Sequence, residues 1–298
     1  MSAPIQRRRS GDSEAAQGMT MIAPPFLYAL ALLAVPLAVM VFISFFQFKL
    51  GYNEVSHGFT LENYRQTWGS EIFRVVTLRS VLVAASVTLT TVVLAFPIAY
   101  FISFHVAPER KSLWLFLITI PFWTSYLIRV FLWKVILGFN GVFSSTLEGL
   151  GIIDGPMSFM TNGVAAISVT LAHAYAPFAI LPIFVALEKI DRSLLEAGLD
   201  LGESKLMTFW RVTLPLAMPG VIAATLIVFI PTIGDYVTPT LIGGGKIPMV
   251  ANLIQSQMLD QNNRPLGAAM AVSAMLVVTL VAVVFLFLNR RVLKGQSR

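Results

Sequence analysis

The stretch SLLEAGLDLGESKLMTFWRVTLPLAMPG, residues 193–220, is charged and interrupted by glycine and proline, although apolar runs flank it on both sides. Ser193 followed by Glu196 predicts a capping box, in which the hydroxyl and the carboxylate each accept a free backbone N–H at a helix start. Gly202 permits the left-handed turn that ends such a helix, and Ser204 can cap a second one. The pattern predicts a rigid amphipathic elbow between two apolar segments.

The composition indicates a membrane protein. Hydrophobic residues make up 56% of the 298 positions and charged residues only 12%, which is about half the charged share of a soluble domain. Six apolar segments are long enough to cross a hydrocarbon core of about 30 Å. They cover residues 21–46, 80–104, 113–137, 163–187, 219–238 and 267–289. We therefore predict an all-α polytopic protein with six transmembrane helices.

The distribution of basic residues predicts the orientation of these spans. An even number of spans puts both termini on one side, and that side carries 13 Lys and Arg residues against six on the other. Cytoplasmic loops are enriched in these residues. The terminal ones are Arg7, Arg8, Arg9, Arg290, Arg291, Lys294 and Arg298. We expect cytoplasmic tails at 1–20 and 290–298, a transmembrane domain at 21–289, and a cytoplasmic loop at about 188–218.

Charge and residue types exclude several kinds of site. The net charge of +6 follows from topology, and no basic run is interleaved with aromatics in the manner of nucleic-acid-binding proteins. The absence of cysteine excludes disulfides and thiolate-bound metals. The three histidines, His57, His105 and His173, lie in different segments, so no metal site is expected. The sequence GGGK at 243–246 lacks the spacing and the Ser/Thr of a phosphate-binding loop.

The loop that contains residues 193–220 resembles the cytoplasmic loop of ABC importer permeases. In that family the loop carries Glu-Ala-Ala, three residues, Gly, nine residues, Ile, one residue and Leu-Pro. The corresponding residues here are Glu196, Ala197, Gly198, Gly202, Val212, Leu214 and Pro215. Gly198 replaces the second Ala, and Val212 replaces Ile. The resemblance implies the type I ABC importer permease fold and makes this loop the coupling helix that docks on a separate ATPase.

Two local alternatives for this loop stay open. An amphipathic segment of this kind can also lie in the lipid headgroup region without binding another protein. Glu196 can act as a member of the capping box alone. Gly202 forms a turn in either case.

Three further stretches resemble the spermidine/putrescine branch of these permeases. They are IPFWTSYLIRVFLWKVILG at 120–138, GDYVTPTLIGG at 234–244 and NRPLGAAMA at 263–271. The resemblance implies a second homologous permease subunit, two ATPase subunits that use ATP and Mg, and a periplasmic solute-binding protein, all at the bacterial inner (cytoplasmic) membrane. It implies neither a cofactor nor an enzymatic activity on this chain. The expected solute is a polyamine such as spermidine or putrescine.

Ionisable and aromatic residues within the spans are candidates for the substrate pathway or gate. A charged group at the bilayer centre costs about 2.5 kcal/mol or more. Counting about 1.5 Å per residue puts Arg129 and Asp235 at a similar outer depth, and we expect them to pair at an external gate. The alternative is that Arg129 snorkels to the interface while Asp235 stays solvated. Four aromatic candidates are Trp123, Tyr126, Tyr175 and Tyr236. Ring faces attract ammonium groups, although interface anchoring is the commoner use of Trp and Tyr.

Other functions fit the sequence less well. An ion-coupled secondary transporter normally shows intramembrane acidic or histidine relays and often related halves. An intramembrane hydrolase needs a nucleophile motif, which the Ser and His residues of the spans lack. The favoured function is a permease subunit that passes a small solute from a periplasmic binding protein to the cytoplasm by alternating access, driven by a separate ATPase. The first alternative is the same machine with another small solute.

Overall fold

The computed structural model describes residues 10–49, 54–56, 58–155 and 163–294. Within these ranges the chain is almost entirely helical, in agreement with the predicted all-α class. The only strands in these ranges form a short antiparallel hairpin of β1 (Gln47–Lys49) and β2 (Glu54–Ser56). Arg7, Arg8, Arg9, His57 and Arg298, which were considered above, lie outside the described residues.

Five helices in the described part of the chain are long and apolar enough to cross a membrane. They are α1 (Ser10–Ile43), α3 (Glu71–His105), α8 (Val164–Glu188), the run that ends in α11 (Leu214–Ile233), and α14 (Arg264–Leu288). Four of the predicted spans fall on α1, α3, α8 and α14. The span predicted over 219–238 is displaced, because its helix begins at Lys205 and ends at Ile233.

The third predicted span, 113–137, is not one straight helix. It consists of α4 (Pro108–Thr119), the 3-10 turn η1 (Ile120–Trp123) and α5 (Tyr126–Ile136), with a bend of 87° between the two parts. Pro121 removes a backbone N–H from the turn. Thr124 and Ser125 follow with ψ angles of 150° and 135°, outside the helical range. The prediction of six spans holds only if this bent pair counts as one span.

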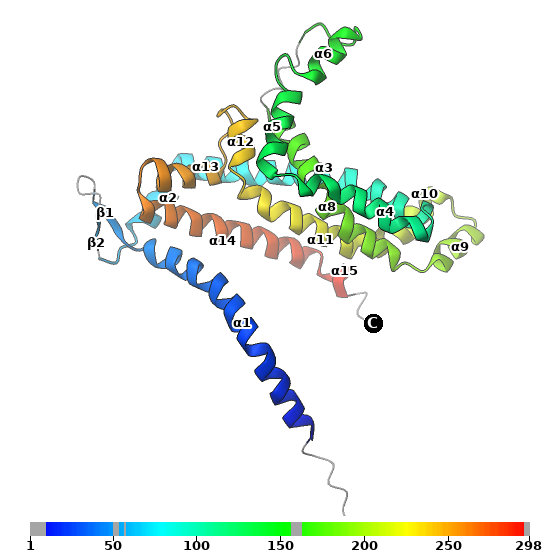
Figure 1. Ribbon diagram of the computed structural model, residues 1–298, viewed down its shortest axis with the longest axis horizontal. Helices are drawn as coiled ribbons and strands as arrows, with labels where there is room; N and C mark the ends of the chain where they lie inside the picture. Colours follow the sequence, from blue (N-terminus) through cyan, green and yellow to red (C-terminus); the bar gives the residue numbers. More distant parts are fainter. Residues whose placement is uncertain (1–9, 50–53, 57, 156–162, 295–298) are drawn as a thin grey trace, which may run out of the picture.

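The long helices α3, α8 and α11 pack side by side around the main apolar core (Figure 1). Gly220 allows α11 to approach α8 closely, because a Cβ at this position would lie 2.5 Å from Ala186 Cβ and from Pro182 O. A second core joins α14 to this group and contains Phe73, Ala84, Phe229, Ile233, Val250, Met270 and Ala274. Together, the two cores fix four long helices relative to one another.

Helix α1 diverges from this bundle, as Figure 1 shows. None of its most apolar 18-residue window is buried within the chain, and its packing against the bundle is made with α14. Apolar surface of this extent requires lipid or another membrane subunit around it.

Short elements lie at the two ends of the bundle (Figure 1). One end carries α9 (Arg192–Asp200) and α10 (Lys205–Thr208), and α10 continues through the π-helical turn η2 (Phe209–Thr213) into α11. The opposite end carries the hairpin, α2 (Glu62–Gly69), α13 (Val250–Gln255) and the π-helical turn η3 (Ser256–Asp260). Three further helices of the described ranges are α6 (Val142–Gly149), α12 (Val237–Leu241) and α15 (Arg290–Lys294).

Candidate functional sites at the two ends of the bundle

Helix α9 begins before the position that the capping-box pattern predicts. Its N-cap is Asp191, whose Oδ1 accepts the backbone N–H of Ser193 at 3.0 Å. The predicted capping box of Ser193 and Glu196 is therefore wrong, because Asp caps a helix as well as Ser does and comes first in the chain. The same N–H holds the pKa of the Asp191 carboxyl below its usual range. Glu196 is exposed and has no capping role.

The turn between α9 and α10 follows the sequence prediction. Gly202 has a φ of +84°, which a residue with a side chain rarely adopts. The N–H of Glu203 donates to Gly198 O at 3.1 Å, which closes the end of α9. Ser204 then caps α10 by accepting the N–H of Met207 at its Oγ, at 3.2 Å. The roles predicted for Gly202 and Ser204 are confirmed.

Gly198 lies at the contact between α9 and α10. It is buried, and a Cβ at this position would lie 3.3 Å from both Cγ2 and Oγ1 of Thr208. Ala197 beside it is exposed. The close contact with Thr208 gives a physical reason for Gly where the family motif has its second Ala.

The α9–α10 end of the molecule exposes large apolar side chains. The exposed fraction is 85% for Leu201, 68% for Leu206 and 58% for Trp210. We call these three residues, with the exposed Leu194, Leu199 and Met207, the tip surface. Exposed apolar side chains amid charged residues mark interaction sites. Leu214 and Pro215 of the motif follow η2 in the chain and begin α11. Leu214 is half-buried and Pro215 is exposed.

A polar cluster occupies the junction between α5, α11 and α12. The Tyr126 hydroxyl donates to Asp235 Oδ2 at 2.7 Å and lies 2.7 Å from Thr238 Oγ1. The other carboxylate oxygen, Oδ1, accepts the backbone N–H groups of Val237 and Thr238 at 2.9 Å and 3.3 Å. We call Tyr126, Asp235 and Thr238 the polar cluster. Only 8% of Asp235 is exposed.

Arg129 lies in the first turns of α5 but does not pair with Asp235. Its Nη1 donates to Ala174 O and its Nη2 to Thr124 O, each at 3.2 Å, and only 6% of the residue is exposed. Of the ion pairs among the described residues, none includes Arg129 or Asp235. The predicted pair, and the alternative in which Asp235 stays solvated, are both wrong for this structure. Depth counted along a straight helix fails here because the chain turns by 87° before Tyr126.

Two of the other three aromatic candidates, Trp123 and Tyr236, are more exposed than Tyr126. Tyr175 is half-buried on α8, with its ring centroid 6.4 Å from that of Phe178. Trp123 is 80% exposed and Tyr236 is 45% exposed. The structure thus joins Tyr126 to Asp235 and leaves Trp123 and Tyr236 at the periphery.

Thr238 is the member of the polar cluster that the sequence analysis missed. The sequence contains a local indication of this contact. Thr238 follows Asp235 by three residues, a spacing at which an Asp carboxylate can accept a backbone N–H. The exposed His173 accepts a hydrogen bond from Trp133 Nε1 at 3.1 Å. Across the described ranges, no group of three or more His, Cys, Asp or Glu residues is placed to hold a metal ion.

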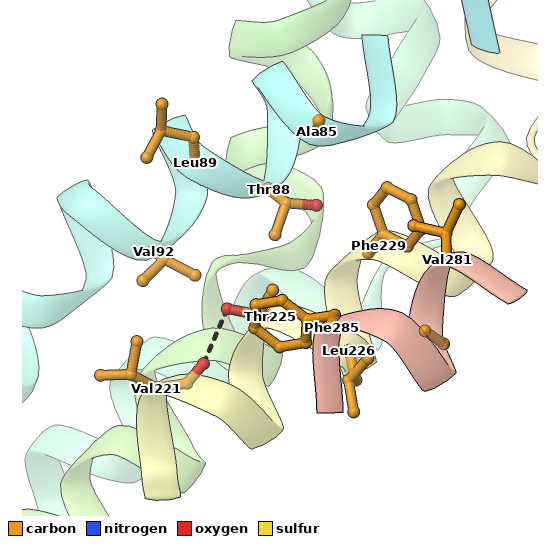
Figure 2. Close-up of a pocket in the computed structure, with 11 residues that line it drawn as sticks. Ala85, Thr88, Leu89, Val92, Val221, Thr225, Leu226, Phe229, Val281 and Phe285 are labelled. Carbon is orange, nitrogen blue, oxygen red and sulfur yellow. Dashed lines mark hydrogen bonds between the residues drawn. The ribbon is translucent and has the colours of Figure 1, made fainter. Parts of the chain in front are cut away.

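An apolar groove lies between α3, α11 and α14, as Figure 2 shows. Its volume is about 390 Å³, and Thr88 and Thr225 are its only lining residues that are not hydrophobic. The Thr225 hydroxyl donates to Val221 O of its own helix at 2.8 Å. No charged side chain lines this groove, so it does not suit a charged solute.

A family model described as binding-protein-dependent transport system inner membrane component matches residues 24–294. The chain belongs to this family. The permease therefore has its place in a membrane, in agreement with the composition, and the matched residues include the 188–218 loop and the polar cluster.

Two relatives of this permease are named spermidine/putrescine transport system permease protein PotB. The Haemophilus influenzae protein is 33% identical over 271 residues, which cover 90% of this chain and 93% of the relative. The Escherichia coli K12 protein is 38% identical over 227 residues, which cover 76% of this chain and 82% of the relative. These similarities confirm the expected ABC importer permease, a transport subunit rather than an enzyme.

A solved structure confirms the expected fold of the permease. A chain of a bacterial alginate ABC transporter, in complex with an alginate-bound periplasmic protein, superposes with a TM-score of 0.68. The alignment covers 96% of this chain and 98% of that chain at 16% sequence identity. Identity this low supports the shared fold alone.

Proposed function

We propose that this permease passes a polyamine such as spermidine or putrescine across the bacterial inner membrane. The observation that carries the proposal is the buried carboxylate of Asp235, which accepts hydrogen bonds from neutral donors and has no ion-pair partner among the described residues. A carboxylate inside a membrane protein is costly and commonly marks a substrate path. An ammonium group arriving in the path would neutralise it. The names of the two relatives support the same solute.

Aromatic rings next to Asp235 fit the rest of such a solute. A polyamine alternates ammonium groups with methylene segments, and aromatic faces attract the first and pack against the second. Tyr126 touches Asp235 directly, and Tyr175 is half-buried on α8. We assign these residues to the pathway and the more exposed Trp123 and Tyr236 to its outer mouth. We assign Arg129 to the support of the bend rather than to a gate pair.

The same proposal makes residues 188–218 the coupling loop. A chain embedded in the bilayer receives motion from a soluble ATPase only through a stiff element that projects from it. The capped helix α9, the Gly202 turn and the tip surface have these properties. The residues that we assign to ATPase coupling are Glu196, Ala197, Gly198, Gly202, Leu214 and Pro215. The ATPase, which uses ATP and Mg, is a separate subunit.

The assembly that we propose has this permease beside a second, homologous permease, with two ATPase subunits in the cytoplasm and a solute-binding protein in the periplasm. Residues 21–289 form the transmembrane domain, and the tails 1–20 and 290–298 are cytoplasmic. The separation of α9 and α10 from α2 and the hairpin, at opposite ends of the bundle, supports the placement of these two groups on opposite sides of the membrane (Figure 1). A permease-like chain seen with a periplasmic protein in the alginate transporter supports the outer partner.

Uptake by the complete complex in liposomes tests the proposed solute. We expect radiolabelled spermidine to enter only with ATP inside and the binding protein outside, and excess putrescine to compete. Butanediol, which has no ammonium group, is the negative control. Spermidine uptake without ATP would support a secondary transporter instead, and ATP-driven uptake of another solute that polyamines do not inhibit would exclude the polyamine.

Cross-linking tests the coupling loop separately. The chain contains no cysteine, so the single change Glu196→Cys gives one defined thiol. We expect a thiol cross-linker to join this position to the ATPase subunit, and Glu148→Cys on the distant helix α6 to give no such product. Absence of the Glu196→Cys product in an active complex would contradict the assignment.

A further inference from the structure

Four residues from four helices meet where the long helices end beside α9. Glu188, the last residue of α8, accepts hydrogen bonds at Oε1 from Lys111 Nζ at 2.6 Å and from Ser103 Oγ at 2.7 Å. Arg192, the first residue of α9, donates from Nη2 to Ser103 O at 3.0 Å. We call Ser103, Lys111, Glu188 and Arg192 the clasp. It ties α3, α4 and α8 to the start of α9.

Among the ion pairs found in the described part of the chain, the pair of the clasp has the best shielded basic side chain. The side chain of Lys111 is 12% exposed and that of Glu188 is 34% exposed. In the other two pairs the basic side chain is 85% and 64% exposed. Exposed pairs contribute little to stability. The Lys111–Glu188 pair is reinforced by Ser103 Oγ, which donates to the same carboxylate oxygen, so reversing either charge replaces the attraction between α4 and α8 by repulsion.

Both charges lie at helix ends that disfavour them. Glu188 is at the C-terminus of α8, where the helix dipole repels an anion. Lys111 is the fourth residue of α4, close to the N-terminus, where the dipole repels a cation. Neither residue is explained by the local rules of its own helix. Residues that contradict local preferences commonly have a functional role.

Helix α4 leads directly from the clasp to the polar cluster. Its 12 residues span about 18 Å at 1.5 Å per residue, and they continue through η1 to the bend. Helix α5 begins there with Tyr126, which bonds Asp235. At the other end, only two residues separate Glu188 from Asp191, the N-cap of α9.

We propose that the clasp is the joint through which motion of α9 reaches the broken helix α4–η1–α5 and so repositions Tyr126 against Asp235. The proposal rests on the coupling role proposed above for α9. Lys111 and Glu188 are positioning residues in this account, because they act on the pathway through α4. The clasp stays closed during the transport cycle, so that the end of α8 and the start of α4 move as one body.

A fluorescence measurement on the complete reconstituted complex tests the joint without reference to any solute. The reporter is an environment-sensitive fluorophore attached at Ile120→Cys, because Ile120 begins η1 and is 44% exposed. The variants are Lys111→Glu, Glu188→Lys and the double charge swap. Arg291→Glu, at an exposed residue of α15, is the control for the change in net charge.

In both single variants we expect ATP hydrolysis to stay within about twofold of the parent, while the ATP-dependent fluorescence change falls about fivefold or more. The charge swap should restore the change, because a double-mutant cycle isolates the pair itself. An undiminished change in the single variants would overturn the proposal. An equal loss in all three variants would overturn it as well, because the pair would then be only structural.

Replacing the ion pair by a covalent bridge tests whether the clasp stays closed. The variant for this test carries Lys111→Cys and Glu188→Cys and no fluorophore. A short bifunctional thiol reagent that joins the two cysteines should restore the number of spermidine molecules taken up per ATP to that of the parent complex. Uptake that the bridge abolishes would mean that the clasp opens in each cycle and would overturn the proposal. If the parent complex takes up no spermidine, the proposal that the solute is a polyamine is excluded. The fluorescence measurement uses no solute, so it still tests whether the clasp transmits motion from α9 to α4.

Discussion

The hydroxyl of Tyr126 donates a 2.7 Å hydrogen bond to Asp235, although 109 positions separate the two residues in the sequence. The bend before Tyr126 turns the first residue of α5 toward the junction of α11 and α12. A buried carboxylate is thereby held in one orientation by a side chain from the broken helix. This relationship, and the rigid loop at the opposite end of the bundle, give rise to the predictions below.

The Tyr126→Phe change should impair transport while leaving the fold intact. It removes the donor to Asp235 and keeps the ring, and a hydrogen bond to a charged group contributes about 1.5–3 kcal/mol. If this energy is added to the barrier for transport, the rate of spermidine uptake should fall about tenfold or more. The control is Tyr28→Phe, which removes a hydroxyl from an exposed residue of α1. Equal uptake by both variants would remove Tyr126 from the pathway.

Charge exchange between Arg129 and Asp235 should not rescue either single change. The guanidinium donates to two backbone carbonyl oxygens, and the carboxylate accepts two backbone N–H groups, so each reversed residue would lose its own local bonds. We expect Arg129→Asp with Asp235→Arg to be at least as defective as the single variants in assembly, measured by size-exclusion chromatography in detergent. Recovery of assembly in the double variant would show that the two residues do pair in another state.

The Arg129→Met change should destabilise the permease. It removes the two hydrogen bonds that the guanidinium donates to Ala174 O and Thr124 O, and a hydrogen bond from a charged group contributes about 1.5–3 kcal/mol. We expect a lower melting temperature in detergent. Lys134→Met on the same helix α5 is the matched control, and a similar loss there would attribute the effect to charge alone.

The Gly202→Ala change should weaken the coupling loop without disturbing the membrane helices. A side chain at a φ of +84° costs about 1–2 kcal/mol, so the turn should relax and displace α10 from α9. We expect weaker binding of the ATPase subunit to the reconstituted permease and an unchanged helical content by circular dichroism. Gly149→Ala is the control, since a Cβ there meets no atom within 4 Å and Gly149 has no positive φ. Unchanged ATPase binding by Gly202→Ala would contradict the role of the turn.

The Gly220→Ala change should separate two of the long helices. Its Cβ would overlap Ala186 and the carbonyl oxygen of Pro182, each at 2.5 Å, and overpacking costs about 1–3 kcal/mol. We expect a lower melting temperature and reduced uptake, again relative to Gly149→Ala. A melting temperature equal to that of the control would indicate that α8 and α11 cross less closely than described.

Local sequence chemistry predicted part of the coupling loop and missed another part. Gly202 and Ser204 act as predicted, because a positive φ and a capping hydroxyl depend on one residue and its nearest neighbours. The predicted start of α9 was wrong. Asp191 and Ser193 are both good N-caps, and the difference in capping preference between Asp and Ser is small. Which of the two caps the helix depends on where α8 ends and α9 packs, and the local pattern does not contain that information.

The sequence by itself determined the class of protein, four of the six spans and the family motif. Hydrophobicity and glycine geometry act over a few neighbouring residues, so they are readable along the chain. The bend before Tyr126, the partners of Arg129 and the contact between Tyr126 and Asp235 were decided only by the tertiary structure. Pro121 weakens a helix but does not dictate a break, since Pro177 and Pro182 lie inside the continuous helix α8. The direction of the chain after Pro121 depends on packing between helices that are distant in sequence, and that direction determines which charges meet.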